Sequence, residues 1–164
     1  MDLSIYDLPA SVEAAIELSP IEDIALGIIR TYLPDIPCYS LIPKEATENA
    51  FILVRRSFAF GEWQGDPRGF IDTARVEVHV YAQDPYGDAR GALISEAVRT
   101  AFRDAHLDNL HIPGRGWVVR TKMVGEPSRK SDWATSAGPV QYADLPDGFW
   151  RYESKFFITV RREF

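Results

Sequence analysis

The chain has 164 residues, of which 46% are hydrophobic and 26% charged, a composition typical of one compact domain that buries a core. Its single cysteine, Cys38, excludes an internal disulfide and a cysteine-based zinc cluster. The net charge of -6 and the pI of about 5.1 argue against a basic clamp for nucleic acid, and no apolar stretch approaches the roughly 18 residues of a membrane span.

Acidic residues are concentrated in the first third of the chain. Residues 1–50 contain nine acidic side chains against only two basic ones, Arg30 and Lys44. The start of the chain, Met1-Asp2-Leu3-Ser4, lacks the basic segment and apolar run of a signal peptide, so we expect no export. Residues 1–18 show helical spacing over two turns only, which is marginal for an isolated helix. We predict an N-terminal arm over residues 1–18 and a single α+β domain over residues 19–164.

The first secure element is a helix over about residues 20–33. Ser19 and Glu22 have the spacing of a capping box, with Pro20 at the first helical position, so their side chains are expected to satisfy free backbone amides. Apolar residues then recur at helical spacing, and Pro34 ends the helix.

Strand-like segments follow Pro37. Residues 38–42 form a short apolar run, and residues 50–57 contain Phe51-Ile52-Leu53-Val54, which we expect to be buried on both faces of a sheet. Residues 58–70 read as a long loop. Residues 72–83 are the clearest strand, because Val76, Val78 and Val80 alternate with polar side chains. One face of the sheet is therefore expected to be polar.

A long helix and two further strands complete the predicted domain. Asp84-Pro85 offers a helix start, and the helix should run to about His106 with an alanine-rich apolar stripe formed by Ala89, Ala92, Leu93, Ala97, Ala101, Phe102 and Ala105. Strands are expected over 117–124 and 149–162, separated by a long loop over 125–148. The order helix-strand-strand-strand-helix-strand-strand is typical of an α+β domain with a mainly antiparallel sheet of about five strands packed against two helices.

Two groups of residues invite a catalytic or metal-binding interpretation. Asp104, His106, Asp108 and His111 could share a divalent ion, but their spacing matches no ligand pattern, and a solvated helix end explains them better. Asp72, Glu77 and His79 resemble the acidic strand residues of metal-dependent nucleases, without the lysine that this pattern needs. The chain also lacks a dinucleotide loop, a phosphate loop and a nucleophile elbow. We therefore predict no catalytic residue, no cofactor and no metal.

Large aromatic side chains are gathered in and beside the two predicted long loops. Exposed Trp, Tyr and Arg are the residue types that dominate protein interfaces. We predict an interface formed by Phe58, Phe60, Trp63, Arg68, Trp133, Tyr142 and Trp150.

Four segments together resemble a known family. They are Ile21–Arg30, Phe51–Arg56, the aspartate-led strand Asp72–Ala82 and the alanine-rich helix Ala89–Phe102. Their order and residue types are similar to those of small neck and tail proteins of long-tailed bacteriophages, and most resemble the tail terminator family of siphovirus-type phages, in particular those of actinobacteria. The likeness covers about residues 20–107 and consists of element order rather than of a catalytic motif.

The resemblance implies a structural virion protein in the tail or neck, assembled in the host cytoplasm. Six copies would form a ring that ends polymerisation of the tail tube and contacts the major tail tube protein and the head-tail connector or stopper protein. Genomic DNA would pass through the channel without specific binding, and no membrane would be involved. The edges of strands 149–162 or 117–124 could add to a neighbouring sheet in such a ring. Alternatives are another neck protein, such as a head-completion or stopper protein, a tail tube subunit, and, from a different class, a metal-dependent nuclease.

Overall fold

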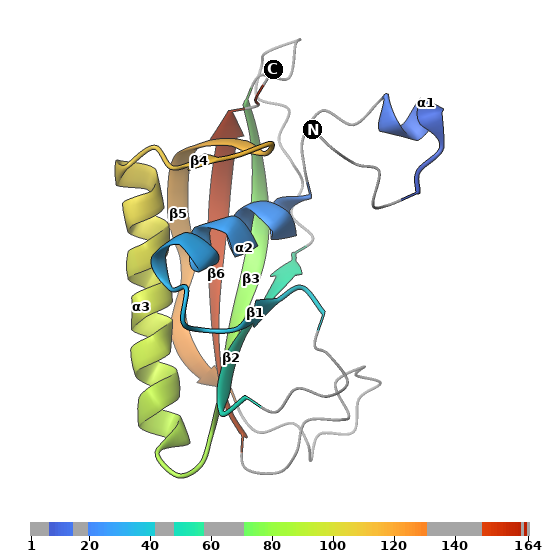
Figure 1. Ribbon diagram of the computed structural model, residues 1–164. Helices are drawn as coiled ribbons and strands as arrows, with labels where there is room; N and C mark the ends of the chain where they lie inside the picture. Colours follow the sequence, from blue (N-terminus) through green and yellow to red (C-terminus); the bar gives the residue numbers. More distant parts are fainter. Residues whose placement is uncertain are drawn as a thin grey trace.

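The computed structural model describes residues 7–14, 20–41, 48–57, 71–130, 149–161 and 163, with the side chain of Asp72 left out. These described residues form a six-stranded sheet and three helices (Figure 1). The helices are α1 (Ala10–Glu13), α2 (Ile21–Tyr32) and α3 (Gly87–Leu107). The strands are β1 (Cys38–Tyr39), β2 (Ala50–Arg56), β3 (Ile71–Gln83), β4 (His111–Ile112), β5 (Gly116–Lys130) and β6 (Phe149–Arg161).

The sheet has the strand order β1-β2-β3-β6-β5-β4, and all pairs are antiparallel except β1 with β2. The expected α+β class and mainly antiparallel sheet are confirmed. The expected count of five strands and two helices is only roughly right. The two-residue strand β4 is too short to produce a periodic pattern, and α1 falls in the segment whose helical spacing we judged marginal for a helix.

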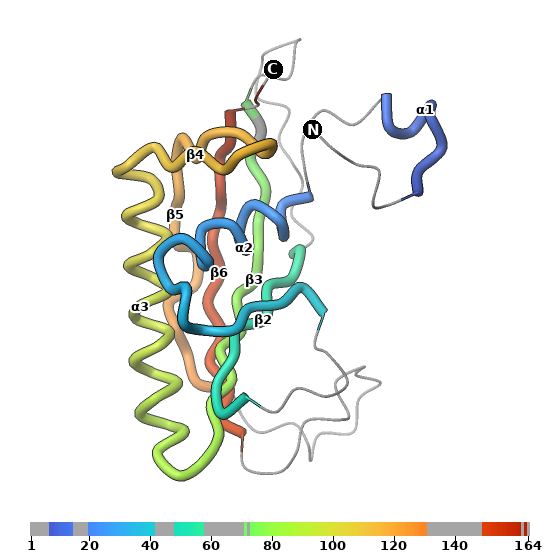
Figure 2. Tube along the Cα trace, in the orientation of Figure 1, coloured from blue at the N-terminus to red at the C-terminus, as the bar shows by residue number. Residues whose placement is uncertain are grey.

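Strand β6 lies inside the sheet, where it pairs with β3 on one side and with β5 on the other. Its predicted role as a free edge is therefore wrong. The C-terminal strand inserts between β3 and β5, which are separated from each other in the chain by α3 (Figure 2). Such an insertion depends on long-range pairing and has no local sequence signal.

Strand β5 is longer than predicted, since it continues from Gly116 to Lys130 through a segment that we expected to begin a loop. Its register against β6 shifts three times, between Val118 and Arg120, Met123 and Gly125, and Gly125 and Ser128. Bulges of this kind accommodate extra residues without ending the pairing. Because they break the strict alternation of apolar and polar residues, the sequence pattern hid the second half of the strand.

Helices α2 and α3 cover the same face of the sheet (Figure 1). Ile24, Ile28 and Ile29 of α2 are fully buried, and so is Phe102 of α3, which stacks on Phe156 of β6. The predicted burial of β2 on both faces is confirmed: Ile52 and Val54 join the helix-side core, whereas Phe51 and Leu53 belong to a small cluster on the opposite face with Tyr81. None of the described helices is long and apolar enough to cross a membrane.

Helix α2 begins as expected near Pro20, and the predicted capping box involves Ser19, which is not among the described residues. Pro20 occupies the N-cap position, and no described side chain caps the helix. The Glu22 carboxylate accepts hydrogen bonds from the backbone amide and the guanidinium of Arg56 on β2. Glu22 thus ties the helix to the sheet through a tertiary contact.

The buried stripe of α3 differs from the predicted one in its first half. Ala89, Ala92 and Leu93 are exposed, Leu93 to 72%, and the buried residues are Gly87, Gly91, Ser95, Val98, Ala101, Phe102 and Ala105. Small residues lie against the sheet because the helix approaches it closely. A Cβ at Gly91 would lie 2.9 Å from the ring of Tyr152. A prediction based on hydrophobicity alone therefore selected the wrong residues in the first half of α3, whereas Ala101, Phe102 and Ala105 are buried as predicted.

Candidate functional site

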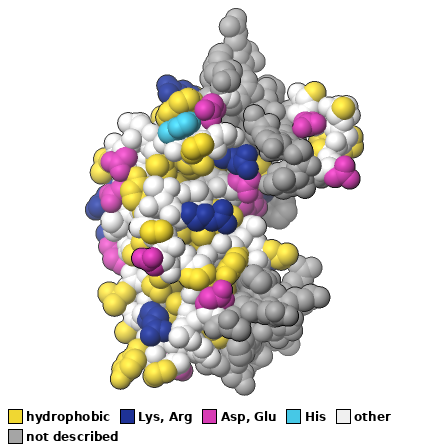
Figure 3. Space-filling model, viewed as in Figure 1, with side chains coloured by type: hydrophobic (Ala, Val, Ile, Leu, Met, Phe, Trp, Pro, Cys, Tyr) yellow, Lys and Arg dark blue, Asp and Glu magenta, His cyan; other side chains and the backbone are white. Residues whose placement is uncertain are grey.

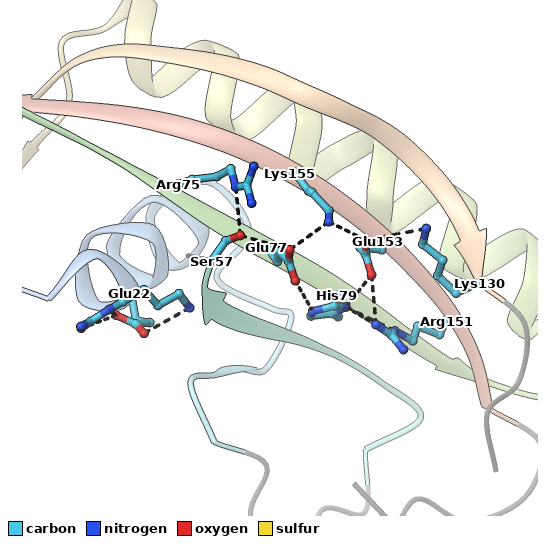
Figure 4. Close-up of polar contacts among 10 residues, drawn as sticks. Glu22, Ser57, Arg75, Glu77, His79, Lys130, Arg151, Glu153 and Lys155 are labelled. Carbon is cyan, nitrogen blue, oxygen red and sulfur yellow. Dashed lines mark hydrogen bonds and ion pairs between the residues drawn. The ribbon is translucent and has the colours of Figure 1, made fainter. Parts of the chain in front are cut away.

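The sheet face turned away from α2 and α3 carries a network of charged side chains on β3 and β6 (Figure 4). The antiparallel register places His79 opposite Glu153 and Glu77 opposite Lys155. Arg151, two residues before Glu153, shares this face because side chains alternate along a strand. The prediction that Val76, Val78 and Val80 face the core while Glu77 and His79 face the other way is confirmed.

His79 lies at the centre of the network and is only 4% exposed. Its Nδ1 accepts hydrogen bonds from the Nε and Nη2 of Arg151, at 3.3 and 3.1 Å. Burial lowers the pKa of His79 to about 4, with a further contribution from the positive charge of Arg151. The imidazole is therefore neutral near pH 7, with its proton on Nε2, which faces Glu77 at 3.9 Å.

Each of the two carboxylates is held by cations of the chain itself. The Lys155 ammonium lies 2.9 Å from Glu77 and 3.4 Å from Glu153, and Glu153 also contacts Arg151 at 3.0 Å and Lys130 at 3.7 Å. Burial alone raises the pKa of Glu77, but the hydrogen bond and charge of Lys155 outweigh it and leave this pKa below its usual value. The pKa of Lys155 is raised for the same reason.

Glu77, His79 and Glu153 have the right chemistry for a divalent metal, since one ligand atom from each lies within 4.8 Å of the others. The surroundings argue against a metal. Arg151 donates to His79 Nδ1, and a metal on Nε2 would require the proton to move to Nδ1, where it would face these donors. Lys155 bridges the two carboxylates that the metal would need. The arrangement is a self-neutralised ion-pair network rather than a preformed metal centre.

The residues of the predicted nuclease pattern are only partly brought together. Glu77 and His79 join the network, whereas the side chain of Asp72 lies outside the described part of the structure. Arg151, Glu153 and Lys155 lie on a strand far along the chain from Glu77 and His79, so the sequence pattern could not pair the two groups. The missing information was the register between β3 and β6.

The second predicted group, at the end of α3, does not form a shared site among the described residues. His106 Nδ1 lies 2.9 Å from the carbonyl of Val119, and Asp108 accepts a hydrogen bond from Tyr32 at 2.7 Å. His111 Nε2 lies 3.3 Å from Glu163. The side chains point to different partners, in agreement with the interpretation as a solvated helix end.

Most of the predicted interface residues, namely Phe58, Phe60, Trp63, Arg68, Trp133 and Tyr142, lie outside the described residues. Trp150 is described and makes contacts within its own chain. Its Nε1 donates to the Asp84 carboxylate at 2.7 Å, and the Arg129 guanidinium lies 3.9 Å from the ring centre. Asp84 therefore orients a tryptophan rather than capping α3, whose N-cap residue is Tyr86.

The outer side of β5 is the longest unpaired strand edge among the described elements. Strand β4 covers only Gly116 and Trp117, and His106 reaches the carbonyl of Val119. From Arg120 to Lys130 no described strand pairs with this side. Pro127 interrupts the row of amide donors, so the usable edge extends from Arg120 to Glu126. An edge of this length can accept a strand from another chain.

The surface above the helices shows no comparable feature. In the view of Figure 3, hydrophobic, basic and acidic side chains are interspersed over α2 and α3 rather than gathered into one patch. The charged network and the edge of β5 are therefore the two features of the described surface with a defined geometry.

Comparisons of the chain with models of known protein families and with curated protein sequences find no match.

Proposed function

We propose that this protein is a structural component of a bacteriophage tail, and that six copies of it form a closed ring that ends the tail tube and joins it to the head connector. The observation that carries the proposal is the unpaired edge of β5 from Arg120 to Glu126. The sequence resemblance over residues 20–107 supports a tail terminator ring as the assembly. No catalytic residue is part of the proposal.

A closed ring requires a heterologous interface, in which one patch of a subunit meets a different patch of the next. The edge of β5 supplies one such patch, because unsatisfied backbone amides and carbonyls on an edge favour addition of an extended segment. Helix α3 lies beside β5 (Figure 1), and no described strand pairs with the outer side of β5 beyond Trp117. These features support assembly by lateral contacts.

The charged network fits a structural role better than a catalytic one. Its carboxylates are neutralised by Lys155, Arg151 and Lys130, and its histidine is neutral and hydrogen-bonded. Ion pairs between strands can specify strand register even where they add little to stability. We therefore assign the network the task of fixing the pairing of β3 with β6.

The decisive test is electron microscopy of phage particles assembled without this protein. We expect overlong tails that lack heads, because nothing ends tube polymerisation. Complementation with the intact chain should restore normal tail length. Tails of normal length attached to heads in the absence of the protein would refute termination.

The alternative neck and tail proteins are distinguished by the structure that each of them binds. A tail terminator ring should bind the ends of purified tail tubes, whereas a stopper or head-completion protein should bind the portal side, and a tube subunit should polymerise into tubes.

The alternative of a metal-dependent nuclease is tested separately. We expect no magnesium-dependent cleavage of plasmid DNA, and cleavage that is lost in Glu77→Ala would revive that alternative.

A further inference from the structure

Two exposed cations on β5 have no counter-charge within the described structure. Arg120 and Lys122 lie on the same sheet face as the charged network, and their cross-strand partners on β6 are the uncharged residues Thr159 and Phe157. Neither cation forms an ion pair with a described carboxylate. Lys130 and Lys155, by contrast, both contact Glu153.

An apolar residue accompanies these cations. Val124 follows Lys122 by two positions and is 47% exposed, at a point where the register against β6 shifts. Lysine on a strand edge usually protects the edge from indiscriminate pairing. The charges of Arg120 and Lys122 also favour an acidic partner on the sheet face from which they project, because such a partner neutralises them. We define Arg120, Lys122 and Val124 as the basic strip.

The segment around α1 has the complementary composition. Residues 1–20 contain four acidic residues and no basic one. In the described part, Asp7 precedes α1 and Glu13 is its last residue. Both are exposed and form no ion pair with a described residue, and Val12 between them is 44% exposed. Helix α1 buries no side chain. Figure 3 shows acidic and hydrophobic but no basic side chains on this segment.

The two features lie on opposite sides of one molecule. Helix α1 lies beyond the side of the sheet formed by β1, β2 and β3, whereas β5 lies at the other side next to α3 (Figures 1 and 2). They therefore cannot meet within one copy in this arrangement. A contact between α1 of one copy and β5 of the next is head-to-tail, which is the geometry that a closed ring needs.

We propose that the basic strip binds the acidic segment Asp7–Glu13 of a neighbouring copy of this chain. Asp7 and Glu13 neutralise Arg120 and Lys122, and Val12 packs against Val124. This inference rests on the proposed ring and names the contact that closes it. It also gives the acidic excess of the first residues a structural role.

Charge reversal tests the contact on the full chain. The variant Arg120→Glu/Lys122→Glu should need at least tenfold more protein for half-maximal assembly, measured by light scattering coupled to size exclusion. Asp7→Lys/Glu13→Lys should show the same defect. The fourfold variant that combines both reversals should regain wild-type assembly, because the pairing is restored with opposite signs. Arg90→Glu/Arg103→Glu on α3 is the matched control, with the same change in net charge and no expected defect.

The outcomes separate this contact from the proposed function. If the wild-type chain forms a ring and Arg120→Glu/Lys122→Glu assembles equally well, the contact is wrong and the ring stands. If both double variants fail but the fourfold variant does not recover, the two patches do not meet, and the contact is again wrong. A wild-type chain that stays monomeric at all concentrations and does not bind tube ends overturns both proposals. Circular dichroism of each variant verifies that it is folded.

Discussion

His79 is a histidine whose surroundings keep it uncharged at neutral pH. It is buried between Glu77 and Glu153, yet the closest donors to its ring belong to Arg151. The loss of hydration and the nearby guanidinium outweigh the two carboxylates and lower its pKa to about 4. The ring therefore acts as a hydrogen-bond acceptor that holds Arg151 in place.

This pKa predicts a pH dependence of stability. In the unfolded chain the histidine pKa is about 6.5, so between pH 6.5 and 4 the unfolded state binds a proton that the native state does not. As the pH falls through this window, the free energy of unfolding should decrease by about 1.4 kcal/mol per pH unit. Above pH 6.5 it should keep its full value. Urea denaturation at pH 7 and pH 5 should show a loss about 2 kcal/mol larger for the wild type than for His79→Gln.

The pH range from 6.5 to 4 distinguishes the titration of His79 from that of the carboxylates. Glu77 has a pKa below its ordinary value of 4.5, so its contribution is retained above that value and is lost only at lower pH. Equal pH dependence of the wild type and His79→Gln between pH 7 and pH 5 would show that the native imidazole titrates normally.

Gly87, at the first position of α3, is required by close packing. A Cβ there would lie 2.4 Å from Cδ1 of Trp150 and 2.7 Å from the carbonyl oxygen of Ala82. The backbone carbonyl cannot move without disturbing β3. We expect Gly87→Ala to lower the free energy of unfolding by roughly 1–3 kcal/mol, despite the better helix propensity of alanine. A thermal shift assay measures this loss, and an unchanged or raised melting temperature would contradict the close contact.

At the scale of elements, α3 shows how far a sequence pattern can mislead. Val98 is fully buried, whereas Leu93 is 72% exposed although it belonged to the predicted stripe. Near its start the helix lies so close to β6 that only glycine and serine fit beneath it, as Gly91 against Tyr152 demonstrates. The hydrophobic pattern correctly predicted the buried residues in the second half of α3. It failed in the first half, where the short distance between the helix and β6 requires small residues.

Truncating one side chain in each half of α3 tests which of them is buried in the core. Val98→Ala removes buried methyl groups and leaves a cavity, so we expect a loss of about 2 kcal/mol in the free energy of unfolding. Leu93→Ala serves as its control, with a change within about 0.5 kcal/mol, because exposed side chains contribute little. Chemical denaturation of both variants gives the comparison. A larger loss for Leu93→Ala than for Val98→Ala would restore the predicted stripe.

At the scale of the whole molecule, the position of β6 inside the sheet determines which surfaces remain available for assembly. Since β6 is paired on both sides, its amides should be the slowest to exchange with deuterium, while outer amides of β5 from Arg120 to Glu126 should exchange quickly in the monomer. Assembly should slow exchange in β5. Hydrogen exchange measured by mass spectrometry at low and high protein concentration tests this, and an assembled state without protection of β5 would exclude this edge from the interface.

The sequence by itself determined the α+β class, the helix near residues 20–33, the doubly buried strand β2 and the polar alternation of β3, because each depends on local periodicity or on nearby Pro residues. The tertiary structure alone decided the rest. The insertion of β6 between β3 and β5 brings Glu153 and Lys155 to His79 and Glu77, and it leaves β5 rather than β6 at the edge. Pairing between distant strands depends on register and chain path, and neither is encoded in the pattern of a single segment.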